Sequence, residues 1–469
     1  MKKSPVRIHS GPDFLRPYSG LSGEFDKNIL AVIGYNRLCG SAGRKGVCDL
    51  KKAVSILLTI VMVFALSAAM ADQVKIDGLA QRNIKINKAG ENTVPAGISP
   101  TTGRSLAEAG KDVKDGFMGM AVTGQYLPLM VQVTNSGSGI GNRAPFFASY
   151  ADVIYESPKD SKGITRMTMV YSDTIPEWVG CTRSMRVMHV WIREEWNAPI
   201  VYHGHQAAGD GNTDVSTAIR ALGWHVPEAP NSPGASVFYD GMYPKEWNAH
   251  HYRVKSMGNI ADNVVYYAPG ILTDVVAKEN IQPRNHTWLF TDTAPEGGDD
   301  AMNVYVSWNN TAVKTSEEKS PFYFNTMFEY DEEEEIYYRY ILKDPENINA
   351  GTAVLYDEMA PVSVKRAGSS EVTADFTHGN PITFSNVIIQ SVNIDWSRGN
   401  EVPVITETGS GNADIFMGGK HYAGVWNRDT LTDRTVFYDE NGNEMPLMRG
   451  KTMIILMDYN REIRQVTYE

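Results

Sequence analysis

Residues 151–203, ADVIYESPKDSKGITRMTMVYSDTIPEWVGCTRSMRVMHVWIREEWNAPIVYH, contain the pattern that decides the fold. Two apolar runs, 151–156 and 167–171, lie on either side of a polar turn and predict strands. Residues 184–196 are compatible with a helix, and 199–203 predicts a further strand. Because strand and helix signals alternate, we expect a mixed α/β domain with a sheet core.

The same alternation continues on both sides of this stretch. Residues 127–133 predict a buried strand and 213–222 a further helix. The second half of the chain has many short strand signals separated by glycine-containing turns, which predict an antiparallel sheet, sandwich or barrel-like domain. Its strand signals cover 303–308, 337–342, 382–392, 402–407 and 453–457, and its turn signals include Gly399-Asn400, Gly409-Ser410-Gly411, Gly418-Gly419 and Asn441-Gly442. We expect an α+β chain with a mixed α/β N-terminal domain at 119–275 and a β-rich C-terminal domain at 285–465.

Composition bounds the class of protein. The chain has 469 residues, which favours two or three domains. Apolar residues make up 42% and charged residues 21%, as in ordinary globular proteins. The net charge is -11; residues 1–71 hold 10 Lys and Arg against 4 Asp and Glu, so the remainder carries -17. A body this acidic is a poor nucleic-acid binder, because phosphate neutralisation needs clustered positive charge.

The N-terminal 71 residues consist of an extension followed by the pattern of a signal peptide. An uncharged apolar run at 53–70 follows Lys51 and Lys52 and ends in Ala69-Met70-Ala71, which has the form of a cleavage site. The alternative is an uncleaved anchor, although eighteen residues are short for a membrane span. We therefore expect a secreted or envelope-associated protein that contacts a membrane only through an uncleaved signal. Residues 72–118 are rich in Gly, Lys, Asn and Thr and predict a leader, with a short helix at 105–112.

The three cysteines exclude a disulfide-built scaffold. Cys39 and Cys48 precede the expected cleavage site, so the exported body carries only Cys181. We expect Cys181 to be buried and chemically inert. A run of five acids at 331–335 lacks the alternating oxygen ligands of a calcium loop and predicts a solvated hairpin tip.

Arginines cluster in the stretch that decides the fold. Arg183 and Arg186 are three apart, beside Ser184 at an expected helix start, and Arg166 lies at a strand start. Three forked donors near a helix N-terminus suit a phosphate or carboxylate. The alternative is that these arginines form ion pairs that only tie elements together; the acidic partners available for this are Asp152, Glu156 and Glu194.

Two further groups of residues bear on chemistry. His203-Gly204-His205 and His250-His251, with a carboxylate such as Asp210, could hold zinc, but no established metal motif accompanies them, so we expect no metal or cofactor. We place His203 beside the arginines as a pocket-lining side chain. Asp152 and Glu156 on one strand would stand roughly 13 Å apart, too wide for a catalytic pair. Glu156 or His203 acting singly remains a candidate acid/base.

Several of these segments, in this order, resemble the bacterial YerB-like lipoprotein family, DUF3048. In the first half the matching segments are 151–156, 163–166, 183–186 and 202–204, and in the second half they include Asn386-Val387-Ile388-Ile389, 409–413, Gly418-Gly419-Lys420 and Gly424-Val425-Trp426. The resemblance runs over about residues 120–465 and implies a two-domain envelope protein without an assigned activity. The apolar run is not followed by a cysteine, so a lipid-anchored form is not expected.

The sequence thus favours an exported protein that binds an anionic small molecule or wall polymer. Arg166, Arg183, Ser184 and Arg186 would form the pocket, with His203 and Glu156 at its edge. Two other classes stay open: a hydrolase or transferase acting on an anionic wall polymer, and a scaffold for envelope proteins. The scaffold would expose an apolar patch on its β-rich domain.

Overall fold

The computed structural model describes residues 73–469, apart from 89, 110–115, 136–146, 162, 208–212, 227–236, 243–249, 255–263, 280, 283, 285, 309–325, 342–352, 355–361, 366–370, 375–379, 400–401 and 460–464. The expected signal segment, Cys39, Cys48 and Asp210 lie outside the described residues. None of the helices within the described ranges is long and apolar enough to cross a membrane.

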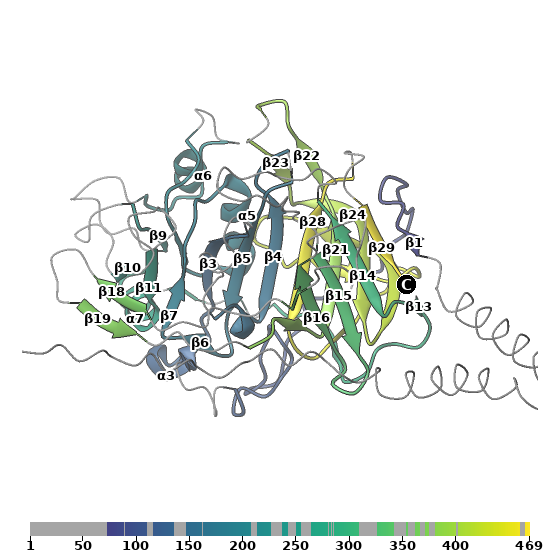
Figure 1. The fold of residues 1–469 in the computed structure, drawn as a ribbon, viewed down its shortest axis with the longest axis horizontal. Helices are drawn as coiled ribbons and strands as arrows, with labels where there is room; N and C mark the ends of the chain where they lie inside the picture. Colours follow the sequence, from purple (N-terminus) through teal and green to yellow (C-terminus); the bar gives the residue numbers. More distant parts are fainter. Residues whose placement is uncertain are drawn as a thin grey trace, which may run out of the picture. The chain divides into compact units, whose positions relative to one another are not determined.

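A mixed sheet runs through the described part of the chain (Figure 1). Its strands, in spatial order, are β13 (Asp299–Asp300), β25 (Lys420–Arg428), β24 (Gly409–Met417), β21 (Asn386–Ser391), β28 (Thr452–Met457), β4 (Val153–Pro158), β5 (Thr165–Tyr171), β3 (Leu129–Thr134), β8 (Ile200–Tyr202) and β9 (Phe238–Asp240), with β26 (Val436–Tyr438) paired to β25. The sheet crosses the expected domain boundary, because β28 pairs in parallel with β4 and places Ile454 beside Tyr155.

Two further sheets and several short pairs complete the strands. One sheet contains β1 (Val74–Lys75), β29 (Gln465–Tyr468), β14 (Asn303–Ser307), β15 (Thr326–Asp331), β16 (Ile336–Ile341), β17 (Ala353–Val354) and β20 (Thr383–Phe384). Another contains β19 (Glu371–Ala374), β18 (Val362–Lys365), β10 (His251–Val254), β11 (Val264–Tyr267) and β7 (Trp178–Gly180). The pairs are β2 (Gly116–Phe117) with β6 (Ile175–Pro176), β12 (Phe290–Thr291) with β27 (Leu447–Met448), and β22 (Asn393–Asp395) with β23 (Val404–Thr406).

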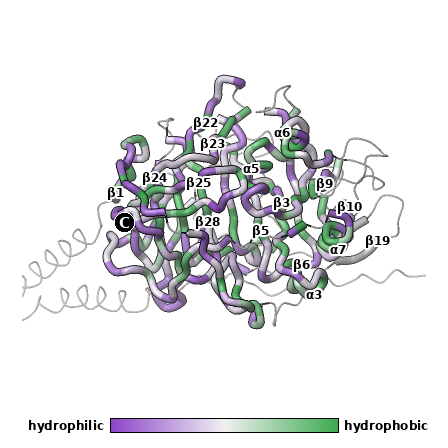
Figure 2. The backbone as a smooth tube through the Cα atoms, turned by 180° about the vertical axis from the view of Figure 1, so that it is seen from behind, coloured by the Kyte–Doolittle hydropathy of each residue, from purple (hydrophilic) through white to green (hydrophobic). Residues whose placement is uncertain are grey.

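Helices are few and short in the described ranges. They are α3 (Gly119–Thr123), α5 (Val187–Trp196), α6 (Val215–Ala221) and α7 (Ala268–Glu279), with a 3-10 turn at Ala148–Tyr150. Figure 2 shows hydrophobic residues in α3 and α7, which pack against each other. The chain is therefore strand-rich with mixed elements. The finer expectation of an α/β N-terminal domain is not supported, because β4 and β5 are antiparallel neighbours joined directly.

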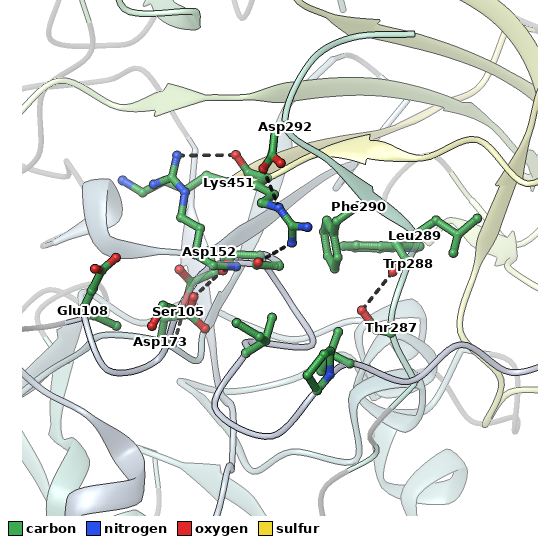
Figure 3. Close-up of a pocket in the computed structure, with 18 of the residues that line it drawn as sticks. Ser105, Glu108, Asp152, Asp173, Thr287, Trp288, Leu289, Phe290, Asp292 and Lys451 are labelled. Atoms are coloured by element: carbon green, nitrogen blue, oxygen red, sulfur yellow. Dashed lines mark hydrogen bonds and ion pairs between the residues drawn. The ribbon is translucent and has the colours of Figure 1, made fainter.

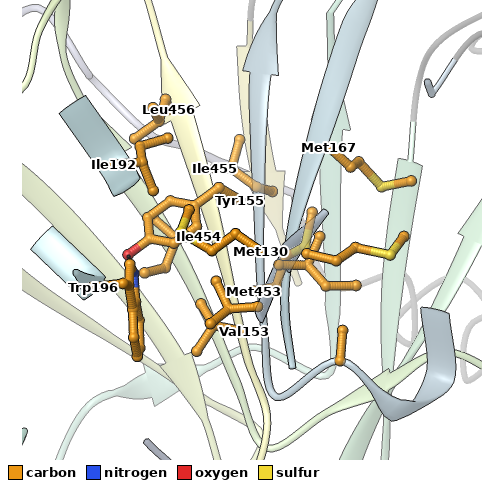
Figure 4. Packing of buried hydrophobic residues seen from close by; sticks show 14 of the residues in the cluster. Met130, Val153, Tyr155, Met167, Ile192, Trp196, Met453, Ile454, Ile455 and Leu456 are labelled. Atoms are coloured by element: carbon orange, nitrogen blue, oxygen red, sulfur yellow. Dashed lines mark hydrogen bonds between the residues drawn. The ribbon is translucent and has the colours of Figure 1, made fainter. Parts of the chain in front are cut away.

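The core forms where β28, β4 and β5 pack beneath α5 (Figure 4). Tyr155 and Ser157 alternate with Glu156 along β4, so they share the face that α5 covers. The indole of Trp196 on α5 donates a hydrogen bond to the Tyr155 hydroxyl at 3.1 Å. This contact anchors the helix to the sheet while leaving its first turn at the end of β4.

Two turn expectations have different outcomes. The acidic run is the exposed turn between β15 and β16, where Asp331 pairs with Ile336, as predicted. By contrast, Gly409-Ser410-Gly411 is the start of β24 and not a turn. A Cβ on Gly411 would lie 2.7 Å from both the Trp426 Nε1 and the Ser391 carbonyl oxygen, which are hydrogen-bonded to each other over this position. Glycine here permits a close approach inside a strand.

The expected leader is packed against the body. β1 pairs with β29, and the Arg82 guanidinium contacts Asp414 and the carbonyl oxygens of Ala413 and Gly424. Residues 106–109 form turns in place of the expected helix, and 110–112 lie outside the described residues. These tertiary bonds, which composition does not reveal, hold the segment in place.

Candidate functional site

The main sheet has one edge at which most of its strands end. β21, β28 and β4 are parallel neighbours, and so are β3, β8 and β9. β5 runs antiparallel to both β4 and β3, so all six strands point the same way and β5 begins where they end. We call this the carboxyl edge. Ligands of open sheets with parallel strands bind outside such ends.

Arg166 and Arg186 converge at this edge on the face that α5 covers. Arg166 lies opposite Ser157, whose hydroxyl is 3.4 Å from His189 Nε2 on α5. The Arg186 backbone N–H, at the helix start, donates to His189 Nδ1 at 2.8 Å. Burial, with the nearby charges of Arg186 and Arg166, holds the pKa of His189 well below its ordinary value. The imidazole is therefore neutral between two buried guanidiniums.

Arg183 lies on the same face. Thr182 bridges to Val133, so the two side chains lie on the same face of the sheet. Arg166 pairs with Thr134, the residue after Val133, and therefore lies on the opposite face. The Arg183 side chain, one residue after Thr182, points to the Arg166 face. The Arg183 amide donates to the Gln132 carbonyl at 2.8 Å. Arg183 is thus two strands from Arg166, about 10 Å at ~4.8 Å per strand.

His203 and Ser184 border the arginines. The His203 amide donates to the Arg183 carbonyl at 3.2 Å. Burial lowers the pKa of His203. The charge of Asp240 raises this pKa, and the charges of Arg253 and Arg183 lower it further. The Ser184 hydroxyl accepts a hydrogen bond from the Arg186 guanidinium at 3.3 Å. Val201 pairs with Val131, so His203, two residues further on, belongs to the face opposite Arg166, and a Cβ on Gly241 would lie 3.0 Å from His203 Nδ1 and 2.7 Å from Val264 of β11. The structure therefore places Arg166, Arg183, Ser184 and Arg186 together at the carboxyl edge, whereas His203 joins them through its backbone and its ring faces the other side.

Glu156 also lies away from the arginines. It lies on the opposite face of β4 from Ser157, and its carboxylate faces Arg339 of β16 at 3.1 Å, both side chains being almost fully buried. Its other oxygen accepts hydrogen bonds from Asn135 and Thr165. The expectation that Glu156 stands at the edge of the arginine pocket is wrong. Ser157, not Glu156, pairs with Arg166, and neighbouring residues of a strand point to opposite faces of the sheet.

The histidines lie with separate acids. His250 Nε2 is 3.0 Å from Asp274, and His205 Nδ1 is 3.1 Å from Asp240. Among the described residues, no group of three or more His, Cys, Asp or Glu is arranged to hold a metal ion. Cys181 is buried, as expected.

A cavity of about 1050 Å³ lies at the other edge of the main sheet, where β4 begins and β5 ends (Figure 3). Asp152 and Asp173 line one side, and the run from Trp288 to Phe290 lines the other. Arg104 and Arg449 also line it, together with Lys451. No sequence pattern indicates this cavity, because its walls come from separate parts of the chain: the expected leader, the residues just before β4 and just after β5, the segment around β12, and the residues after β27.

The two aspartates share a serine. The Ser172 hydroxyl is 2.9 Å from one oxygen of Asp152 and 3.0 Å from one of Asp173, so those oxygens lie no farther apart than the sum of the two distances. Burial, with the charge of Asp173, raises the pKa of Asp152 to about 7, and burial also raises the pKa of Asp173. A hydroxyl donates one proton, so both contacts are hydrogen bonds when one carboxyl is protonated.

Two family profiles match the chain over this structure. The DUF3048 N-terminal domain, of unknown function, matches residues 120–239, and the DUF3048 C-terminal domain matches 313–454. The chain belongs to the DUF3048 family. Its fold is similar to the crystal structure of the YerB protein from Bacillus subtilis, with a TM-score of 0.51, 18% identity, and coverage of 77% of this chain and 96% of that chain. No curated protein matches.

Membership of the DUF3048 family confirms the resemblance seen in the sequence. The N-terminal profile spans Arg166, Arg183, Arg186 and His203. At this identity the likeness to YerB shows the fold alone.

Proposed function

We propose that this DUF3048 protein is exported to the cell envelope and binds an anionic small molecule or wall polymer at the carboxyl edge. Arg166, Arg183 and Arg186 hold the anion, and Ser184 borders it. The observation that carries the proposal is the convergence of three arginines on one sheet face beside the first turn of α5. A helix start contributes amide donors and partial positive charge to the same place.

The negative charge of the rest of the chain limits how an anion can be bound. Residues 72–469 carry a net charge of -17, so a non-specific attraction of polyanions is unfavourable. Binding of an anion therefore requires a local cluster of forked donors, which arginine provides in bidentate form. His189 is buried beside Arg166 and Arg186 and is neutral, so the positive charge at this place comes from the arginines.

The test is titration calorimetry of the exported body with pyrophosphate and with poly(glycerol phosphate). The double variant R183A/R186A should lose binding at least tenfold while its thermal unfolding stays cooperative. The matched control R104A/R449A removes the same charge from the cavity at the opposite edge and should bind as the parent does. Equal binding by R183A/R186A and the parent would refute the assignment, and loss in the control alone would move the site to the cavity.

The scaffold alternative receives less support from the described surface. Its large exposed hydrophobic side chains are scattered and do not form a patch on the β-rich strands; they are Val74, Leu79, Met120, Val122, Met242 and Leu289. Single exposed apolar residues are normal for a soluble surface.

A further inference from the structure

His205 lies between a serine and an aspartate. Its Nε2 is 3.0 Å from the Ser216 hydroxyl oxygen, and its Nδ1 is 3.1 Å from Asp240 Oδ2. A nucleophile within reach of a base, and a base within reach of an orienting acid, are the two contacts that define a serine triad on any fold. No sequence motif announces these residues, since they come in the order His, Ser, Asp from three separate elements.

The fold brings the three residues to the carboxyl edge. Asp240 is the last residue of β9, and His205 follows β8, which is parallel to β9. Gly204 lies between the end of β8 and His205 and has a positive φ of 73°. A Cβ at this position would lie 2.6 Å from the Met242 sulfur. Ser216 is in the first turn of α6, which is held by the hydrogen bond from the Val215 amide to the Gln206 carbonyl at 3.1 Å.

Asp240 fixes the state of His205. It is fully buried, and its Oδ1 accepts hydrogen bonds from the amides of Gly204 at 2.6 Å and Met242 at 3.0 Å. Its Oδ2 then faces His205 Nδ1, which as an N–H donor leaves the Nε2 lone pair for the Ser216 proton. This is the tautomer that a general base requires.

A second serine–histidine contact in the same part of the chain has the opposite tautomer. His189 Nδ1 accepts the Arg186 amide proton, so its Nε2 carries hydrogen and donates toward Ser157. His189 cannot take a proton from that serine at Nε2. In the Ser216–His205 pair, by contrast, Asp240 accepts the hydrogen bond from the Nδ1 proton, and the serine can therefore donate its proton to Nε2.

We propose that Ser216, His205 and Asp240 are the nucleophile, the base and the orienting acid of an esterase site for acyl esters that carry a negative charge. Resting on the proposed anion site, this assignment places the charge of the substrate at Arg183. The segment that carries Arg183 lies against the triad, because the Met185 amide donates to the Gly204 carbonyl and the Gln206 amide to the Met185 carbonyl.

The reaction balances with water as co-substrate. Ser216 Oγ bonds to the acyl carbon while its proton passes to His205 Nε2, and the ester C–O bond then breaks as the alcohol takes that proton. A water molecule next adds to the acyl-serine and gives a proton to His205. The bond to Ser216 Oγ breaks, the serine recovers the proton, and a carboxylic acid leaves.

The first experiment is covalent labelling of the whole exported body with a fluorophosphonate probe, followed by peptide mass spectrometry. We expect one adduct, at Ser216. S216A and H205A should abolish it, and Asp240→Asn should slow labelling by about 10³- to 10⁴-fold, since the amide disfavours the required tautomer. Ser157→Ala is the matched control and should label as the parent does. A folded parent protein that is not labelled at Ser216 would overturn the proposal, whatever the variants do.

The second experiment separates this proposal from the anion site. p-Nitrophenyl succinate, an anionic ester, should be hydrolysed with a higher kcat/KM than p-nitrophenyl butyrate, and R183A/R186A should remove that preference while fluorophosphonate still labels Ser216. Labelling with no preference and no pyrophosphate binding would leave the triad standing and refute the anion site. Pyrophosphate binding without labelling would refute the triad and leave the anion site standing.

Discussion

Asp152→Asn tests the shared-proton interpretation of the cavity at the edge opposite the arginines. Asp152 is buried and accepts hydrogen bonds at one oxygen from the Ser172 amide, the Ser172 hydroxyl and the Asp173 amide. Asparagine keeps an oxygen for these donors but cannot ionise. The variant therefore removes a titration and leaves the packing almost unchanged.

The sign of the effect follows from the pKa. Burial and the charge of Asp173 raise the pKa of Asp152 from 3.8 to about 7 in the folded protein. Between these values the native state keeps a proton that the unfolded state releases, so folding stability falls as pH rises from about 4 to 7 and is then constant. At about 1.4 kcal/mol per pKa unit, the loss is on the order of 4 kcal/mol.

The assay is urea unfolding of parent and variant from pH 4.5 to 8.5. The difference in free energy of unfolding, variant minus parent, should rise by up to that amount over the range. Subtracting the parent removes titrations that are independent of Asp152, such as that of Glu407, whose pKa burial raises to about 8. Asp292→Asn, which changes an exposed carboxylate of the same cavity, should give a flat difference. A flat difference for Asp152→Asn would refute the shared proton.

Three further predictions concern Glu156, Gly204 and the N-terminal segment. Glu156→Ala should destabilise the fold by about 3–5 kcal/mol, because it leaves Arg339 buried without its charge partner, as denaturant unfolding would measure; a loss below 1 kcal/mol would contradict this. Gly204→Ala should lower stability by about 1–3 kcal/mol, since alanine is strained at this positive φ, and a midpoint unchanged in thermal unfolding would count against it. Fractionation with N-terminal sequencing should find the mature chain in the envelope or medium, starting at Asp72, whereas full-length cytoplasmic protein would argue against export.

The regular strands could be predicted from the sequence because their burial imposes a pattern. The expected strand at 167–171 and helix at 184–196 correspond to β5 and α5, with ends moved by two or three residues. The start of β24 was not predicted, because its first residues, Gly409-Ser410-Gly411, are typical of a turn. Gly411 leaves room for the indole of Trp426, which comes from the neighbouring strand β25. Local pattern cannot reveal what a residue will face across a sheet.

The candidate site shows the same limit. The arginine cluster could be anticipated, since Arg183 and Arg186 are close in sequence and Arg166 lies at the start of a strand that the sequence predicts before them. Assigning Glu156 to it required the strand register, and a single-residue difference in register reverses the face. Asp173 and Ser216 were not anticipated at all, because their partners, Asp152 and His205, are 21 and 11 positions away on other elements.

The claim that three arginines together hold an anion is tested most directly by a crystal of residues 72–469 soaked with sodium tungstate. The anomalous signal should reveal tungstate at the carboxyl edge, within hydrogen-bonding distance of Arg166, Arg183 and Arg186. Tungstate found only beside Arg104 and Arg449, or an empty carboxyl edge in a crystal whose lattice leaves it open, would contradict the account.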